Sequence, residues 1–117
     1  MAHLSVANRA IVAVNGRASG LHDPEVVLDA IRAATADTGV DVRGVITDGE
    51  DDLRDAIDAA QGGRLVLAGG DGSVHFALNV AEGPIEIGLV PMGRANNIAR
   101  SLGLPRDVPR AARVAVT

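Results

Sequence analysis

The chain has 117 residues, the size of one ordinary domain, and 47% of them are hydrophobic, so it can bury a core of its own. Its formal net charge of −4 and its single aromatic residue argue against a nucleic-acid surface, which needs basic patches and aromatic faces for stacking. The absence of cysteine excludes disulfides and thiolate metal sites, and it fits a reducing, cytoplasmic location. No stretch approaches the roughly 20 apolar residues of a membrane-spanning helix, so we expect no transmembrane segment.

The apolar pattern alternates between short β-like runs and stretches with helical spacing. In chain order it predicts strand 10–14, helix 23–39, strand 40–47, helix 53–60, strand 65–68, helix 74–81, strand 85–90, helix 96–102 and helix 109–116. Asp23-Pro24 is a typical helix start, with an N-cap residue followed by proline in the first turn. Strands that alternate with helices predict an α/β fold, a parallel sheet and one domain over residues 1–117.

Three loops rich in glycine or asparagine follow predicted strands. They cover residues 15–20, 69–72 and 92–97. Ligands of open parallel sheets bind outside the carboxyl ends of the strands. If the first, third and fourth strands are near neighbours, these loops form one crevice.

The loop Gly69-Gly70-Asp71-Gly72 lies between a predicted strand and a predicted helix. Glycine can adopt positive φ and lets a bulky anion approach the backbone, and the first N–H groups of the next helix point toward such an anion. The carboxylate of Asp71 would repel phosphate. It makes sense where a metal bridges the two groups, or where it takes a proton from an attacking hydroxyl. The loop therefore indicates nucleotide chemistry.

Two motifs resemble the diacylglycerol kinase catalytic-domain family, which includes diacylglycerol, sphingosine and ceramide kinases. The first is Gly-Gly-Asp-Gly-Ser-Val-His-Phe-Ala-Leu-Asn from Gly69, and the second is Pro-Met-Gly-Arg-Ala-Asn-Asn-Ile-Ala-Arg-Ser-Leu-Gly-Leu-Pro from Pro91. The Asn15 loop resembles the family's Asn-Pro-x-Ser-Gly, with Gly16 in place of proline. The resemblance covers nearly the whole chain. It implies a three-layer, Rossmann-like domain with a mainly parallel sheet, similar to the N-terminal domain of NAD kinases and diacylglycerol kinases.

The resemblance also implies roles for single residues. Asp71 would be the catalytic base or a magnesium-linked carboxylate. The residues implied to bind the nucleotide are Asn15, Gly69, Gly70, Gly72, Ser73, Gly93, Arg94 and Asn96. The implied reaction transfers the γ-phosphoryl group of ATP, with Mg²⁺, to a lipid hydroxyl. In the family a β-rich domain that helps to bind lipid follows this one; we expect it to be missing here, and this chain alone to be inactive. Peripheral membrane contact of the full protein and a homodimer are further expectations.

Three positions depart from the family pattern. Phe76 replaces a glutamate, Arg94 a threonine and Asn97 an aspartate. Arg94 could clamp a phosphate, because a guanidinium offers paired donors. Two alternatives stay open: a degenerate nucleotide-binding or regulatory domain without activity, and an NAD or sugar kinase of the same superfamily.

Overall fold

The computed structural model describes residues 9–16, 23–61, 63–83, 85–92 and 108–116. Its elements are β1 (Arg9–Asn15), α1 (Pro24–Thr35), β2 (Asp41–Thr47), α2 (Glu50–Ala59), β3 (Arg64–Gly69), α3 (Asp71–Val80), β4 (Glu86–Pro91) and α5 (Val108–Val116). This alternation confirms the predicted α/β class. The expected helix 96–102 and the residues Gly93, Arg94, Asn96 and Asn97 lie outside the described residues.

The four strands form one parallel sheet in the order β2-β1-β3-β4. β1 and β3 are inner strands of this sheet and are buried along most of their length, because helices cover both of their faces. β2 is an edge strand in which exposed and half-buried residues alternate. β1, β3 and β4 are therefore neighbours, which is the condition under which the three predicted loops share one edge of the sheet.

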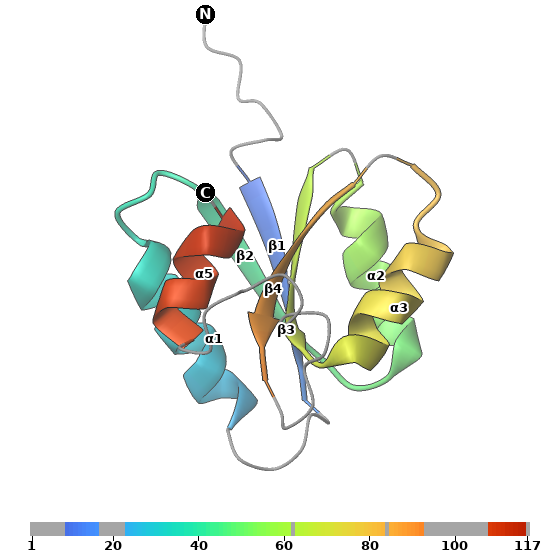
Figure 1. Cartoon of the computed structure of the whole chain (residues 1–117), viewed down its shortest axis with the longest axis horizontal. Coiled ribbons are helices and arrows are strands. Elements are labelled where there is room, and N and C mark those ends of the chain that lie inside the picture. Colours follow the sequence, from blue (N-terminus) through green and yellow to red (C-terminus); the bar gives the residue numbers. More distant parts are fainter. Residues whose placement is uncertain (1–8, 17–22, 62, 84, 93–107, 117) are drawn as a thin grey trace, which may run out of the picture.

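Helices cover both faces of the sheet, which gives the predicted three layers. α1 and α5 lie on one face, and α2 and α3 lie on the other (Figure 1). Alternate residues of β1 supply the two cores: Val12 packs toward α1 and α5, whereas Ile11 and Ala13 pack toward α2 and α3. Burial on both faces explains why the inner strands are continuously apolar in sequence.

The helix boundaries follow their caps more closely than their apolar stripes. α1 begins as predicted, with the Asp23 carboxylate accepting a hydrogen bond from the Glu25 N–H at 2.9 Å. It ends at Thr35, four residues before the expected Gly39. α2 and α3 both begin three residues earlier than the pattern predicts, because their first turns, at Glu50 and Asp71, lack apolar residues of helical spacing.

Two arginines tie α5 to the rest of the molecule. Arg113 donates to the Ala34 carbonyl, in the last turn of α1, at 2.9 Å. It also donates to the carboxylate of Asp37, which lies just beyond the end of α1, at 2.6 Å. Arg64 of β3 donates to the Val116 carbonyl and forms an ion pair of 2.8 Å with Glu86. These contacts hold α5 against the amino end of the sheet.

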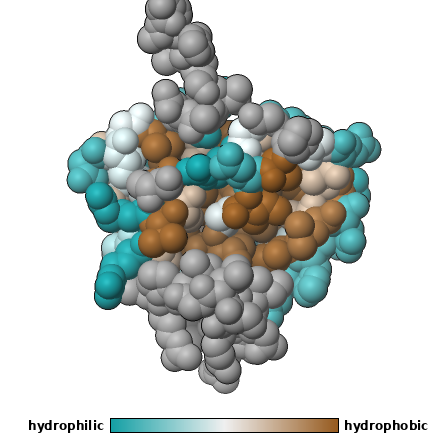
Figure 2. All heavy atoms as spheres, turned by 45° about the horizontal axis from the view of Figure 1, so that its top comes forward, coloured by the Kyte–Doolittle hydropathy of each residue, from teal (hydrophilic) through white to brown (hydrophobic). Residues whose placement is uncertain are grey.

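The described sheet has a second edge at β4. Half-buried Ile87 and Leu89 of β4 pack toward α3. Figure 2 shows an apolar area at the centre of the visible face, with hydrophilic residues on its left and right. Within the described ranges, no helix has both the length and the apolar character needed to cross a membrane.

Candidate functional site

Three strand ends meet at the carboxyl edge of the sheet. Asn15 ends β1, Gly69 ends β3 and Pro91 ends β4. Gly69 is paired with Pro91 in the ladder, and its carbonyl accepts a hydrogen bond from the Met92 N–H at 3.0 Å. The beginnings of the three predicted loops therefore lie side by side.

The backbone of Gly69 lies directly against two polar side chains. A Cβ placed on Gly69 would be 3.2 Å from the Ser73 hydroxyl oxygen and 3.3 Å from the Asn15 Cβ. Both contacts would be tighter than usual, so a side chain at this position would require Ser73 or Asn15 to shift by a few tenths of an ångström, and glycine avoids that shift. Positive φ, the other expectation for this loop, is not observed at Gly69, Gly70 or Gly72. The structure thus brings Asn15, Gly69 and Ser73 into one cluster.

The amino end of α3 is built differently from that of α1. Gly70 occupies its N-cap, and no side chain there accepts a hydrogen bond from the first turn. In α1 the Asp23 side chain performs that task. The early N–H groups of α3 are donors that a phosphate oxygen can accept. Asp71 is half-buried in this first turn, so a carboxylate lies beside those donors.

A cleft of about 310 Å³ opens between the first turns of α2 and α3 at this edge. It is lined by Asn15, Thr47, Gly49, Glu50, Leu53, Gly72, Ser73 and Phe76. Three residues implied to bind the nucleotide, Asn15, Gly72 and Ser73, line it together. Gly69, Gly70 and Asp71 adjoin them along the chain.

Four lining residues come from the end of β2 and the segment after it, which were not expected at the site: Thr47 is the last residue of β2, and Gly49, Glu50 and Leu53 follow it. The buried Thr47 hydroxyl donates to the Val14 carbonyl at 3.4 Å, and the Thr47 carbonyl accepts from the Gly16 N–H at 2.8 Å. Gly49 has φ of 110°, a conformation that favours glycine, and lets the chain turn into α2. The sequence feature that could have indicated this part of the site is Thr47-Asp48-Gly49, at the end of a predicted strand. The acidic first turn of α2 follows it and places Glu50 in the cleft.

Phe76 replaces a carboxylate with an apolar wall. It lines the cleft together with Leu53, and its ring centroid lies 5.6 Å from the guanidinium carbon of Arg54 on α2. That distance is within the range of a cation–π contact. The substitution therefore joins α2 to α3 and makes one side of the cleft apolar.

The acidic residues of the site are dispersed. Within the described ranges, no group of three or more His, Asp or Glu side chains is arranged to hold a metal ion. Asp71 supplies a carboxylate at the start of α3, and Ser73, two residues further along the helix, supplies a hydroxyl. Mg²⁺ commonly uses one or two protein carboxylates together with substrate phosphates. These residues fit a metal that shares its ligands with a nucleotide.

The comparisons with known proteins agree with this geometry. The sequence profile of the diacylglycerol kinase catalytic domain matches residues 9–117. The "Probable lipid kinase YegS-like" protein of Chromohalobacter salexigens is 34% identical over 110 residues, which cover 88% of this chain and 34% of that protein. The "Diacylglycerol kinase" of Mycobacterium tuberculosis (H37Rv) is 38% identical over 78 residues, which cover 63% of this chain and 25% of the relative.

The fold is similar to solved structures as well. A diacylglycerol kinase structure from Bacillus anthracis superposes with a TM-score of 0.76 at 24% identity, covering 93% of this chain and 42% of that one. The chain therefore spans about a third of the length of a relative such as the Chromohalobacter protein. The match of the family profile over almost the whole chain, together with the strand order and the Gly69 loop, shows that the chain belongs to the diacylglycerol kinase catalytic-domain family.

Proposed function

We propose that this chain is the nucleotide-binding part of an ATP-dependent lipid kinase, which transfers the γ-phosphoryl group of ATP to a lipid hydroxyl such as that of a diacylglycerol. The family membership supports a kinase. The observation that carries the nucleotide role is the convergence of Asn15, Gly69 and Ser73 in front of the uncapped start of α3. Backbone donors, a hydroxyl and an amide at a strand end form a suitable cradle for phosphates.

Asp71 is proposed as the proton acceptor. Asp71 lies in the first turn of α3, next in sequence to the Gly70 N-cap of the proposed phosphate cradle. A base at this position takes the proton of the acceptor hydroxyl as the oxygen attacks the γ-phosphorus. The N–H groups of α3 and the Ser73 hydroxyl would hold the phosphate oxygens in line with that attack.

Mg²⁺ is proposed to accompany the ATP, with Asp71 as the protein carboxylate nearest to it. When bound, the ion would neutralise the charge of the phosphate oxygens. Glycines 69, 70 and 72 contribute no side-chain charge, so the anionic phosphates meet only backbone donors from these positions. Gly93, Arg94 and Asn96 are proposed to complete the nucleotide site from the loop after β4.

The acceptor lipid is proposed to bind mainly through parts of the natural protein beyond this chain. Relatives of the family are about three times as long as the matched segment. We also propose a cytoplasmic location, because ATP is available there and because a chain without cysteine fits a reducing compartment.

Substitution of Asp71 tests the proposed reaction. In the natural protein that contains this chain, Asp71→Asn should lower kcat for phosphorylation of a short-chain diacylglycerol by about 10²–10⁴-fold, which is the usual contribution of a general base. Thermal stability should change little, since Asn keeps the size of Asp. The matched control is Asp29→Asn on the exposed face of α1, which should leave kcat unchanged. Near-normal turnover by the Asp71 variant would exclude its proposed role.

Phe76 favours a second candidate function, a nucleotide-binding domain without turnover. It puts an aromatic ring in the cleft where the family pattern has a carboxylate. Tight ATP·Mg²⁺ binding by the natural protein, with no phosphorylation of any lipid in a panel, would favour this candidate over the kinase. Measurable phosphorylation of one lipid would exclude it. An NAD kinase or sugar kinase would instead phosphorylate its own acceptor in the same assay.

A further inference from the structure

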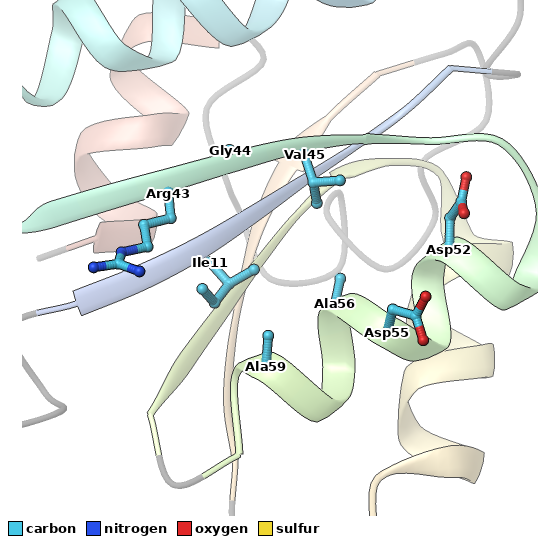
Figure 3. Close-up of a pocket in the computed structure, with 8 residues that line it drawn as sticks. All are labelled: Ile11, Arg43, Gly44, Val45, Asp52, Asp55, Ala56 and Ala59. Carbon is cyan, nitrogen blue, oxygen red and sulfur yellow. The ribbon is translucent and has the colours of Figure 1, made fainter.

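A second hollow lies away from the nucleotide cleft, between the outer strand β2 and helix α2. It has a volume of about 260 Å³. Its lining residues are Ile11, Arg43, Gly44, Val45, Asp52, Asp55, Ala56 and Ala59 (Figure 3). We call this hollow the β2 groove. It shares no lining residue with the nucleotide cleft.

The floor of the β2 groove is apolar and open to solvent. Ile11 of β1, Val45 of β2 and Ala56 and Ala59 of α2 face it (Figure 3). Val45 is 37% exposed, although it lies in a strand whose other face is covered by α1. α2 contacts both β1 and β2, yet Arg43 and Val45 on the α2-facing side of β2 stay exposed, so this side of β2 is only partly covered. The groove is therefore an apolar surface along the sheet edge rather than a closed cavity.

The backbone of β2 is also available at this edge. β2 pairs with β1 on one side, and among the described residues no strand pairs with its other side. An edge strand presents a row of N–H and C=O groups that can bind an additional extended segment. A segment added there would lay its alternate side chains over the β2 groove.

The charge of the groove wall selects the occupant. α2 carries five carboxylates and one arginine, and two of the carboxylates, Asp52 and Asp55, line the groove. Arg43 at the far end of the groove is already paired with Asp41 at 3.4 Å. Among the described residues Asp55 has no ion-pair partner, and Asp52 accepts one hydrogen bond, from the Asp48 N–H at 2.8 Å. The wall is therefore acidic and suited to a cation.

We propose that the β2 groove binds an extended basic segment of a partner protein, which adds to the β2 edge. Its groove-facing residues would alternate between a small aliphatic side chain, packed on Val45 and Ala56, and an arginine or lysine, paired with Asp52 and Asp55. A second copy of this chain is a poorer occupant. Symmetric pairing of two β2 edges would bring two acidic α2 helices to the same junction, and like charges repel.

A synthetic peptide tests this proposal directly. The probe is Arg-Thr-Val-Thr-Arg-Thr-Val-Thr with blocked ends, and the control peptide has glutamate in place of arginine. The 117-residue chain should bind the arginine peptide and not the glutamate peptide. Binding should slow amide exchange at residues 42–46 of β2, while residues 86–90 of the opposite edge strand stay unchanged.

Two matched double variants separate the groove from the general charge of α2. Asp52→Asn with Asp55→Asn should weaken peptide binding roughly fivefold, which corresponds to the loss of two exposed ion pairs. Asp51→Asn with Asp58→Asn removes the same charge from the same helix outside the groove and should have a much smaller effect. Val45→Arg should abolish binding, because it fills the floor with a like charge.

Three results would overturn the proposal. These are equal binding of the two peptides, equal weakening by the two double variants, and protection that spreads equally to β4. Concentration-dependent protection of β2 without any peptide, accompanied by a doubled mass in light scattering, would identify a second copy as the occupant and would also overturn it. Salt should weaken binding of the arginine peptide, as expected for exposed charges.

Discussion

At the scale of single residues, the site depends on how little space surrounds Gly69. The two side chains nearest to a Cβ at this position are Ser73 of α3 and Asn15 of β1. Gly69 therefore lies where β1 and α3 come close together. The sequence motif predicted the residue types of this cluster. It predicted that glycine would have positive φ or would let an anion approach; positive φ is not observed, and the groups that lie close to Gly69 are two side chains of the chain itself.

Gly72 allows binding and stability to be separated. A Cβ at Gly72 would meet nothing within 4 Å, and the residue lies in the first turn of α3 and lines the cleft. Gly72→Ala should therefore raise the free energy of unfolding by up to about 0.5–1 kcal/mol, because alanine is the better helix former. The same methyl group would protrude into the cleft and should weaken ATP·Mg²⁺ binding about tenfold, a cost of about 1.4 kcal/mol.

His75→Ala is the control for this experiment. His75 is exposed on the same helix and does not line the cleft, so its replacement should affect helix stability without affecting nucleotide binding. Thermal denaturation and calorimetry with ATP·Mg²⁺ measure the two effects. Unchanged affinity of the Gly72 variant would show that its position in the cleft has no role in binding.

The cleft residues that the sequence pattern did not predict lie at the end of β2 and in the segment that follows it. Thr47, Glu50 and Leu53 line the cleft, yet the pattern only marked a strand end and an acidic stretch there. Their position depends on β2 lying next to β1 and on α2 crossing back over the sheet. Neither fact can be read from local periodicity, because both depend on long-range packing.

At the scale of elements, every described helix and strand was predicted, and the errors are at the ends. α2 and α3 begin three residues before their apolar stripes, because the first turn of each is formed by acidic residues and glycine near the cleft. α1 ends at Thr35, whose hydroxyl donates to the Ile31 carbonyl at 2.8 Å, and not at Gly39. Periodicity reports which face is buried and not where the backbone hydrogen bonds stop.

The contact between α1 and α5 should make stability depend on pH. A hydrogen bond from Arg113, together with its positive charge, lowers the pKa of Asp37 below its ordinary value of 3.8. The unfolded chain therefore binds this proton more tightly than the folded chain. The carboxylate contributes stability above about pH 3.8, and this contribution is lost as the pH falls through the lowered pKa.

Asp37→Asn should consequently be less stable than the unsubstituted chain at pH 6, and the difference should shrink toward zero in strong acid. Urea unfolding between pH 2.5 and about pH 7 measures this difference. Asp29→Asn is the control, since Asp29 lies 3.8 Å from Arg32 within one helix and does not join two helices. A stability gap for Asp37→Asn that stays constant over the whole pH range would contradict the assignment.

At the scale of the whole molecule, the alternation of strands and helices predicted the class and the parallel sheet, and the resemblance to the kinase family implied the three layers. The strand order β2-β1-β3-β4 could not be predicted from the sequence. The sequence predicted only that the three loops would meet if β1, β3 and β4 were neighbours. That condition is met. The part of the crevice expected from Gly93, Arg94 and Asn96, the role of Mg²⁺, membrane contact and a homodimer stay predictions.

The nucleotide cleft and the β2 groove, both lined by described residues, have different characters. The cleft beside α3 combines backbone donors with Asn15, Ser73 and one lining carboxylate, Glu50, and we propose that it binds the phosphates of ATP·Mg²⁺. The β2 groove combines an apolar floor with Asp52 and Asp55 and suits a cationic ligand. A nucleotide and a basic segment would therefore bind at separate places, and competition between them is not expected.

The most direct test of the nucleotide site is a titration of the isotopically labelled 117-residue chain with ATP·Mg²⁺, followed by amide NMR. The largest shifts should occur at Asn15 and at residues 69–73, with smaller ones at Thr47 and Gly49 across the cleft. The amides of Arg64 and Glu86, at the amino end of the sheet, should not move. Saturable shifts centred on the β2 groove, or no saturable shifts at residues 69–73, would contradict a nucleotide site at the start of α3.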